Sequence, residues 1–264
     1  MAQPPTAFLF DLDGTLYTSH GAIPGAVELL RTLRRRGVPF RCVTNTTGRP
    51  RSGVVARLRG YGFEVEADEI RTPLIAAVAL AREQGVRVIA PFVAPETLED
   101  LGGFVLTGGT TAATPTAPPD LVLVGDLGER WTFGLMQEAF RYLLDGARLV
   151  ALSRDRYWMT AGGLTLDAGP FVAGLEYAAG TAATVVGKPS REFFRSALSG
   201  LGLGEGAEFR GVAMVGDDIR SDIEGAQQTG CQGWLVRTGK YREAAVRESG
   251  VVPDRILDSV ADLL

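Results

Sequence analysis

The sequence predicts an α/β protein in which a parallel sheet is flanked by helices. Three observations support this fold class. Short apolar runs alternate with helical patterns along all 264 residues. No repeat of solenoid type is present. Four separate apolar runs end in polar residues, namely Asp11, Thr44, Lys188 and Asp217. Because ligands of open parallel sheets bind beyond the carboxyl ends of the strands, these four residues predict one shared site.

The strands are predicted from the apolar runs. They fall at residues 7–10, 38–43, 86–90, 121–124, 148–152, 184–186, 212–215 and 234–236. Residues 157–166 predict a hairpin that turns at 161–163. The stretch 108–119 is rich in Gly, Thr, Ala and Pro and predicts a loop.

The helices are predicted from apolar spacing and from residues typical of helix ends. Pro24 opens the first helix and Gly37 ends it, while Thr72 and Pro73 suit an N-cap and first turn. Helices are expected at 24–37, 51–60, 72–84, 131–144, from 170 onward, at 191–201 and 219–229, with a short one near the C-terminus.

Composition excludes several classes of partner. The formal net charge is −4 and the pI about 5.2, so no bulk attraction to nucleic acid or to anionic lipid is expected. The apolar run 7–10 is too short for a signal or spanning segment, and a cytoplasmic location is the default expectation. Cys42 and Cys231 lie in or beside apolar runs, which favours buried free thiols over a disulfide.

Asp11 and Asp13 form the first cluster that carries chemistry. Two carboxylates two positions apart, on a turn just past a strand, can act on one ligand. A turn that merely ends the strand is the alternative reading. A calcium loop does not fit, because Gly14 stands at the fourth loop position and Ala22 occupies the place of the bidentate glutamate.

Thr44, Asn45 and Lys188 could bind a phosphate. Thr44 and Asn45 offer a hydroxyl and backbone N–H groups, although a plain helix-entry turn explains them equally well. Lys188 is either a surface charge or a compact counter-charge to phosphate. Only Lys188 and Lys240 are lysines among the 27 basic residues, which favours a specific role for Lys188.

Asp217, Asp218 and Asp222 lie at a strand-to-helix junction. An N-cap and the helix dipole explain one or two acidic residues there. Three such residues beside another acidic strand end would repel one another unless a cation lies between them. Oxygen ligands favour Mg²⁺ over zinc, and the single histidine, His20, gives no support for zinc.

Together these segments resemble the haloacid dehalogenase (HAD) superfamily. Its motifs correspond to DLDGT at 11–15, TN at 44–45, K at 188 and GDDIRSD at 216–222, in the family's order. The insert resembles the α/β cap of subgroup IIA, also called a C2 cap. The resemblance therefore implies a Rossmann-like parallel-sheet core at 1–71 and 184–264, with a cap at 72–183 that closes over substrate.

The resemblance also implies roles for the residues. Asp11 would be the nucleophile and Asp13 the general acid and base. Mg²⁺ would be held by the carboxylates of Asp11 and Asp217 and by the backbone carbonyl of Asp13. The remaining positions follow the same motifs: Thr44, Asn45 and Lys188 would bind the transferring phosphate, Asp222 would orient Lys188 or metal-bound water, and Asp218 would lie beside the metal ligands.

The implied activity is a phosphatase acting on a small phosphorylated compound through an aspartyl phosphate. Asp13 disfavours carbon–halogen cleavage, for which the superfamily does not need an acid at that position. Phospholysine, phosphohistidine or pyrophosphate are alternative substrates, and a phosphoacceptor or phosphate-binding module without turnover is the rival class. Relatives of this subgroup often form homodimers, so a homodimer is an open expectation.

Some residues of the cap region remain open. Trp131, Tyr157 and Trp158 are expected to be used in packing rather than in a substrate pocket. Asp126, Glu129 and Arg130 follow a strand of the cap and are candidates for contacts to the non-phosphate part of the substrate, while a solvated loop explains them nearly as well. The role of Lys240 is equally open.

Overall fold

The structure is a computed structural model that describes residues 4–111, 117–160, 162–202 and 209–264. The chain divides into two compact units. The first contains residues 1–44, 52–71 and 188–264, and the second contains residues 45–51 and 72–187. The domain bounds expected from the sequence stay a prediction, because a compact unit is not by itself a separately folding domain.

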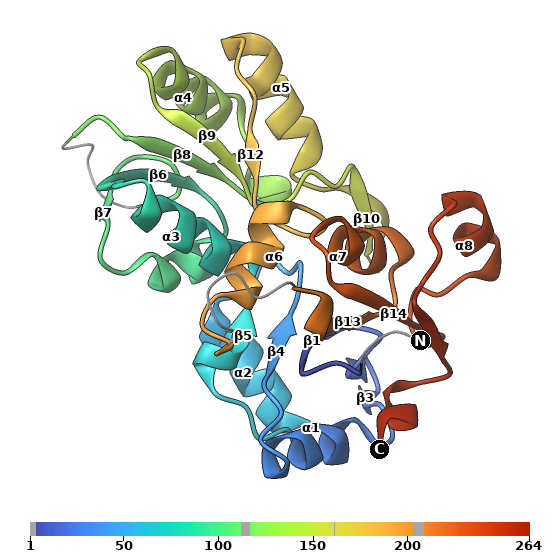
Figure 1. Cartoon of the computed structure of the whole chain (residues 1–264). Coiled ribbons are helices and arrows are strands. Elements are labelled where there is room, and N and C mark those ends of the chain that lie inside the picture. The colour runs from blue at the N-terminus through green and yellow to red at the C-terminus, as the bar shows by residue number, and fades with distance from the viewer. Residues whose placement is uncertain (1–3, 112–116, 161, 203–208) are drawn as a thin grey trace. The chain divides into compact units, whose positions relative to one another are not determined.

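The first unit is built on a parallel sheet, which has six strands in the described part of the chain (Figure 1). Its order is β15-β14-β13-β1-β4-β5. The strands span β1 Ala7–Asp11, β4 Phe40–Val43, β5 Ile70–Arg71, β13 Val212–Gly216, β14 Gln232–Val236 and β15 Arg255–Leu257. The central strand is therefore β1, which pairs with β4 on one side and β13 on the other.

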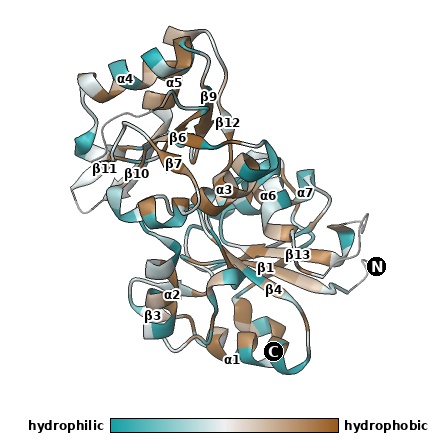
Figure 2. Cartoon of the chain, turned by 90° about the vertical axis from the view of Figure 1, so that its left-hand side faces the viewer, coloured by the Kyte–Doolittle hydropathy of each residue, from teal (hydrophilic) through white to brown (hydrophobic). Residues whose placement is uncertain are grey.

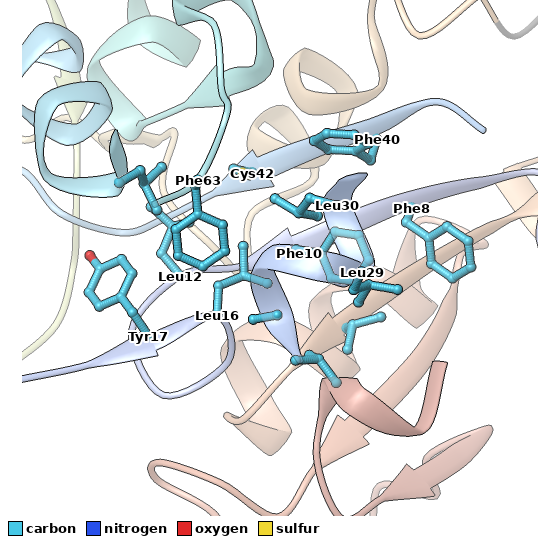
Figure 3. Close-up of a cluster of buried hydrophobic side chains, with 14 of the residues drawn as sticks. Phe8, Phe10, Leu12, Leu16, Tyr17, Leu29, Leu30, Phe40, Cys42 and Phe63 are labelled. Carbon is cyan, nitrogen blue, oxygen red and sulfur yellow. The ribbon is translucent and has the colours of Figure 1, made fainter. Parts of the chain in front are cut away.

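Helices cover both faces of this sheet. They are α1 Ala26–Arg35, α2 Arg51–Gly60, α6 Arg191–Leu198, α7 Gly225–Gln228 and α8 Glu243–Ser249. Side chains of α1 and α2 share one buried cluster with Phe8, Phe10 and Phe40 (Figure 3). On the other face, Ile223 and Leu235 form a smaller cluster against which Val246 of α8 packs.

The second unit contains a parallel sheet with the order β12-β9-β8-β6-β7. Its strands are β6 Val88–Phe92, β7 Val105–Leu106, β8 Leu121–Val124, β9 Arg148–Ala151 and β12 Thr184–Val185. The helices of this unit are α3 Pro73–Glu83, α4 Phe133–Leu144 and α5 Gly169–Ala179. A separate hairpin joins β10 Tyr157–Thr160 to β11 Gly163–Leu166. The predicted α/β fold class, with parallel sheets and helices in two parts, is therefore confirmed.

The hydropathy of the strands explains why both sheets are buried. The strands β1 and β13 are largely hydrophobic along their length (Figure 2), and every residue of both is buried. Strands of a parallel sheet covered on both faces read as continuous apolar runs of this kind. Cys42 and Cys231 are buried free thiols, as expected. Within the described ranges, no helix has the length and apolarity needed to span a membrane.

Short elements and helix ends differ from expectation. The strands β5, β7 and β15 were not predicted, because two or three residues form no recognisable run. The expected helix at 219–229 begins as a π-helical turn, Ile219–Glu224, and continues as α7. Part of the predicted loop at 108–119 and the turn position 161 lie outside the described residues.

We predict that the buried cluster, rather than apolar character in general, sets the stability of the first unit. Val65 and Val252 both lie outside regular structure in this unit, but Val65 is 1% exposed and Val252 is 80% exposed. Val65→Ala should lower the free energy of unfolding by about 2 kcal/mol, because it removes buried methyl groups and leaves a cavity. Urea unfolding measures this loss. Val252→Ala is the matched control, and equal midpoints for both variants would contradict the prediction.

Candidate active site

Asp11 is placed by the centre of the first unit's sheet. It is the last residue of β1, and it lies opposite Val43 of β4 in the strand register. On the other side Phe10 pairs with Val215 of β13, so Asp217 follows two residues beyond that pair. The ends of β1, β4 and β13 therefore bring Asp11, Thr44 and Asp217 to the same edge of the sheet.

Lys188 joins two carboxylates that are far apart in sequence. Its Nζ donates to Oδ1 of Asp11 at 2.5 Å and to Oδ1 of Asp222 at 2.6 Å. The side chain of Lys188 is only 3% exposed, and that of Asp222 only 1%. Burial lowers the pKa of Lys188, but Asp11 and Asp222 together outweigh it, and the pKa is raised above its ordinary value. The ammonium therefore stays charged.

Asp222 is held by the backbone of its own loop as well. Its Oδ2 accepts a hydrogen bond from the N–H of Asp218 at 3.1 Å. A Cβ at Gly216 would lie 2.3 Å from the same oxygen, so glycine is required for the close approach. Burial raises the pKa of Asp222 to about 6, with Lys188 opposing that rise.

Asp218 caps the helical turn that begins at Ile219. Its Oδ1 accepts from the N–H groups of Arg220 and Ser221, each at 3.0 Å. Burial alone would raise the pKa of Asp218, but these hydrogen bonds and the nearby Lys240 lower it. The side-chain ammonium of Lys240 lies 3.4 Å from Oδ2 of Asp218. The capping role of Asp218 accounts for one member of the acidic run.

Asp11, Asp217 and Asp222 form a group that could hold a metal ion. One carboxylate oxygen from each lies within 4.8 Å of the others, and all three residues are buried. With Lys188 as counter-charge, three negative groups and one positive group leave two negative charges in this described cluster. Burial raises the pKa of Asp11 above its ordinary value and that of Asp217 to about 6. Buried charge without compensation is costly, so a divalent cation fits this set.

Asp13 projects from the same turn as Asp11 but is exposed. Its Oδ2 accepts a hydrogen bond from the phenol of Tyr17 at 3.0 Å. Tyr17 is 3% exposed, and Arg57 lies over its ring at 5.3 Å from the centroid. Burial and the Asp13 carboxylate raise the pKa of Tyr17, so the phenol stays protonated and can donate this hydrogen bond to Asp13. Sequence reasoning missed Tyr17, because nothing in the residues around it indicates that its phenol contacts Asp13.

Thr44 and Asn45 follow β4 directly. Thr44 is 5% exposed, and its N–H donates to the carbonyl of Arg71 at 3.1 Å. Asn45 belongs to the second compact unit, where its Oδ1 lies 3.3 Å from the Cβ position of Gly187. Their roles in phosphate binding stay predictions.

The candidate residues of the second unit have local partners. Asp126 accepts from the N–H of Gly128 at 2.8 Å, and Arg130 pairs with Glu96 at 3.2 Å. Glu129 lies in the same short 3₁₀ helix, Gly128–Arg130. Such local contacts are those expected of a solvated loop. Contacts of Asp126, Glu129 and Arg130 with a substrate stay a prediction.

The aromatic residues expected in packing behave differently from one another. Trp131 stacks on Phe92 and Phe171, with ring centroids 6.1 and 4.7 Å away. Tyr157 and Trp158 are 53% and 49% exposed, so the packing expectation is wrong for these two. The reason is that their strand pairs only in a two-stranded hairpin, outside the five-stranded sheet of the described chain.

Comparisons with known proteins place the chain in a family. The family model described as haloacid dehalogenase-like hydrolase matches residues 8–102, and a HAD-hydrolase-like model matches residues 185–263. The cattle (Bos taurus) protein called haloacid dehalogenase-like hydrolase domain-containing protein 2 is 42% identical over 238 residues, covering 90% of this chain and 86% of that protein. The chain belongs to the haloacid dehalogenase-like hydrolases.

Two further relatives extend this result. The human phospholysine phosphohistidine inorganic pyrophosphate phosphatase is 35% identical over 263 residues, covering 96% of this chain and 91% of its own length. The structure of p-nitrophenyl phosphatase from Archaeoglobus fulgidus matches 99% of this chain and 98% of its own, at 28% identity and a TM-score of 0.86. This haloacid dehalogenase-like hydrolase is therefore a phosphatase.

We predict that Asp167 costs the fold stability at neutral pH. Burial raises the pKa of Asp167 to about 6, and Asp126 and Asp155 add to the rise. The ionised form is therefore unfavourable in the folded state, and this cost is fully present above that pKa and lost as the pH falls to about 4. Asp167→Asn should raise the free energy of unfolding by about 1 kcal/mol at pH 7.5, after allowance for partial solvation, and by nothing at pH 4.

Thermal melts at the two pH values measure this difference. Asp145→Asn is the control, because Asp145 is exposed in the same unit. A gain for Asp167→Asn that is equal at both pH values would contradict the prediction.

Proposed function

We propose that the chain is a Mg²⁺-dependent phosphatase that hydrolyses small phosphorylated compounds through an aspartyl phosphate on Asp11. The observation that carries this proposal is the buried contact of Lys188 with Asp11, 177 residues away in sequence. The carboxylates of Asp217 and Asp222 lie beside Asp11 in the same group. An ammonium beside a carboxylate lets a charged phosphate approach a charged nucleophile. The phosphatase relatives give the same reaction class independently.

In the first step, a carboxylate oxygen of Asp11 attacks phosphorus in line, and the bond from phosphorus to the leaving oxygen breaks. Asp13 gives its proton to that oxygen. In the second step, Asp13 takes a proton from water, which attacks the phosphorus of the aspartyl phosphate. Inorganic phosphate leaves, and the Asp11 carboxylate is restored. Exposure of Asp13 beside the buried Asp11 suits a group that must exchange protons with solvent.

The proposed metal ligands are the carboxylates of Asp11 and Asp217 and the backbone carbonyl of Asp13. When bound, Mg²⁺ would supply positive charge that neutralises the phosphate oxygens. Asp222 lies within the same carboxylate group, but Lys188 and the N–H of Asp218 contact both its oxygens. We therefore assign Asp222 to holding Lys188 in place.

Phosphate recognition is proposed for Lys188, the Thr44 hydroxyl and Asn45. Asp218 lies beside the metal ligands and acts through the helical turn that it caps. Residues 72–183 are proposed as the cap that sets the substrate. Substrates with a phosphorus–nitrogen or pyrophosphate bond remain a second choice, favoured by the similarity to the phospholysine phosphohistidine inorganic pyrophosphate phosphatase.

We predict that Asp11→Asn abolishes turnover. The amide is a far weaker nucleophile than the carboxylate, so release of phosphate from p-nitrophenyl phosphate should fall by about a thousandfold or more. EDTA should abolish turnover of the unchanged protein, and added Mg²⁺ should restore it. Acid-quenched protein incubated with labelled substrate should carry a phosphoryl group only when Asp11 is present.

The control for this experiment is Asp258→Asn, since the side chain of Asp258 is 80% exposed and forms an ion pair with Arg237, which is exposed as well. Wild-type activity in Asp11→Asn would refute the nucleophile assignment. One phosphoryl group per molecule without further turnover, across a panel of phosphorylated metabolites, would instead favour the phosphoacceptor module.

We predict that the Tyr17 hydroxyl supports Asp13. Tyr17→Phe removes one hydrogen bond to a carboxylate and should lower kcat about tenfold with little change in KM, because the ring and its packing remain. Tyr61→Phe is the matched control, since the Tyr61 ring packs against Tyr17 with centroids 5.3 Å apart. Steady-state kinetics on both variants measure the effect, and equal kcat values for Tyr17→Phe and Tyr61→Phe would contradict a specific role of the Tyr17 hydroxyl.

A further inference from the structure

The segment Thr238-Gly239-Lys240 follows β14 and is not used in the proposed reaction. It lies in the first unit with Asp11 and Asp217. Its contacts reach two separate loops, the turn that carries Asp11 and Asp13 and the loop that carries Asp217. The contacts with Gly14 and Asp217 are made by its backbone and by one hydroxyl, whereas the Lys240 ammonium lies 3.4 Å from Asp218.

The first contact is a close packing of backbone around the Asp217 carboxylate. A Cβ at Gly239 would lie 2.0 Å from Oδ2 of Asp217, and a Cβ at Gly14 would lie 2.1 Å from the same oxygen. The two glycines also touch each other, because the Gly239 Cβ position lies 2.6 Å from Cα of Gly14. Both have positive φ, +85° at Gly14 and +61° at Gly239. The carboxylate thus lies in a slot that only glycine can form.

The second contact is a pair of hydrogen bonds that fix this slot. The N–H of Lys240 donates to Oδ2 of Asp217 at 2.7 Å. The hydroxyl of Thr238 donates to the backbone carbonyl of Gly14. One short segment is therefore bonded both to the metal-binding carboxylate and to the turn that holds the nucleophile.

The opposite side of the segment has little support. Thr238 and Gly239 line an open cavity of about 570 Å³. The cavity is also lined by Ser259 and by the short hairpin of β2 Tyr17–Thr18 and β3 Gly21–Ala22. Side chains do not fill the space behind the segment. Other contacts of the segment are at longer range: Arg242 donates to the Gly239 carbonyl at 3.3 Å and the Lys240 ammonium lies 3.4 Å from Asp218, so the bonds to Asp217 and Gly14 are its short ones.

We propose that Thr238-Gly239-Lys240 is a positioning segment that fixes the Asp217 carboxylate relative to the turn bearing Asp11. The inference rests on the proposed function, because that proposal makes the Asp217 carboxylate a ligand of Mg²⁺. Partners that orient a metal ligand from outside the coordination shell commonly change metal affinity by about 10- to 100-fold when they are removed. Lys240 acts on the Asp217 carboxylate through its backbone N–H.

Gly239→Ala tests the slot, with Gly37→Ala as a matched control. Gly37 has a similar φ of +65°, but a Cβ there would meet nothing within 4 Å. Both substitutions carry the same backbone strain, and only Gly239→Ala displaces the Asp217 carboxylate. Calorimetric titration of the metal-free proteins with Mg²⁺ should show affinity lower by at least roughly tenfold in Gly239→Ala alone. At saturating Mg²⁺, kcat should fall while KM stays unchanged.

Thr238→Val gives a second test that adds no strain. It removes the hydroxyl bond to Gly14 and should weaken Mg²⁺ binding several-fold, while Thr238→Ser should restore it. If Gly239→Ala does not fold, the pair at Thr238 decides the matter. Mg²⁺ affinities equal to wild type in Gly239→Ala, or in Thr238→Val, would overturn the inference even if the protein is an active phosphatase. A wild-type protein without phosphatase turnover would instead overturn the proposed function. The two failures are distinguishable, because the titrations measure Mg²⁺ binding and require no turnover.

Discussion

The buried ammonium of Lys188 determines how the rest of the site is arranged. It contacts Asp11 and Asp222 in a region from which water is nearly excluded, and each of these charges would be costly there alone. The pairing explains why the strand that ends at Asp11 and the turn that holds Asp222 are fixed against each other. It leaves the cluster with more negative than positive charge, and that imbalance suits the proposed binding of a divalent cation. The contacts of Lys188 with Asp11 and Asp222 therefore hold this part of the fold together and also arrange the groups of the proposed reaction.

Much of this arrangement could be predicted from the sequence. Asp11 and Asp217 lie at the ends of β1 and β13, neighbours in one parallel sheet whose strands direct their carboxyl ends to one edge, so their meeting followed from topology. Lys188 follows β12, a strand of the other sheet, so its contact with Asp11 did not follow from that argument. The scarcity of lysine drew attention to Lys188, which the structure places beside Asp11 and Asp222, while its role in phosphate binding stays a prediction. The four-motif resemblance placed the chain in its family, which the comparisons confirm. Long periodic elements such as α2 and α4 were predicted nearly to their ends.

Other features could not be predicted, because they depend on contacts rather than on residue type. Tyr17 contacts Asp13 through a tight turn, and its sequence neighbours carry no signal of that contact. Lys240 attracted attention by its charge, whereas its closest contact with Asp217 is made by the backbone N–H. Gly239 is one of 34 glycines, and only coordinates show that it lies against a carboxylate. Tyr157 and Trp158 are exposed because the hairpin that carries them pairs apart from the main sheet.

The placement of β1 between β4 and β13 has a consequence for biosynthesis. One neighbour, β4, follows within a few dozen residues, but β13 begins at Val212, in the last quarter of the chain. At ribosomal speeds of about 5–20 residues per second, β1 waits on the order of ten seconds or more with one hydrogen-bonding edge open. An open apolar edge invites pairing with other chains. The edge of β1 that pairs with β13 therefore stays open until the last quarter of the chain has been translated.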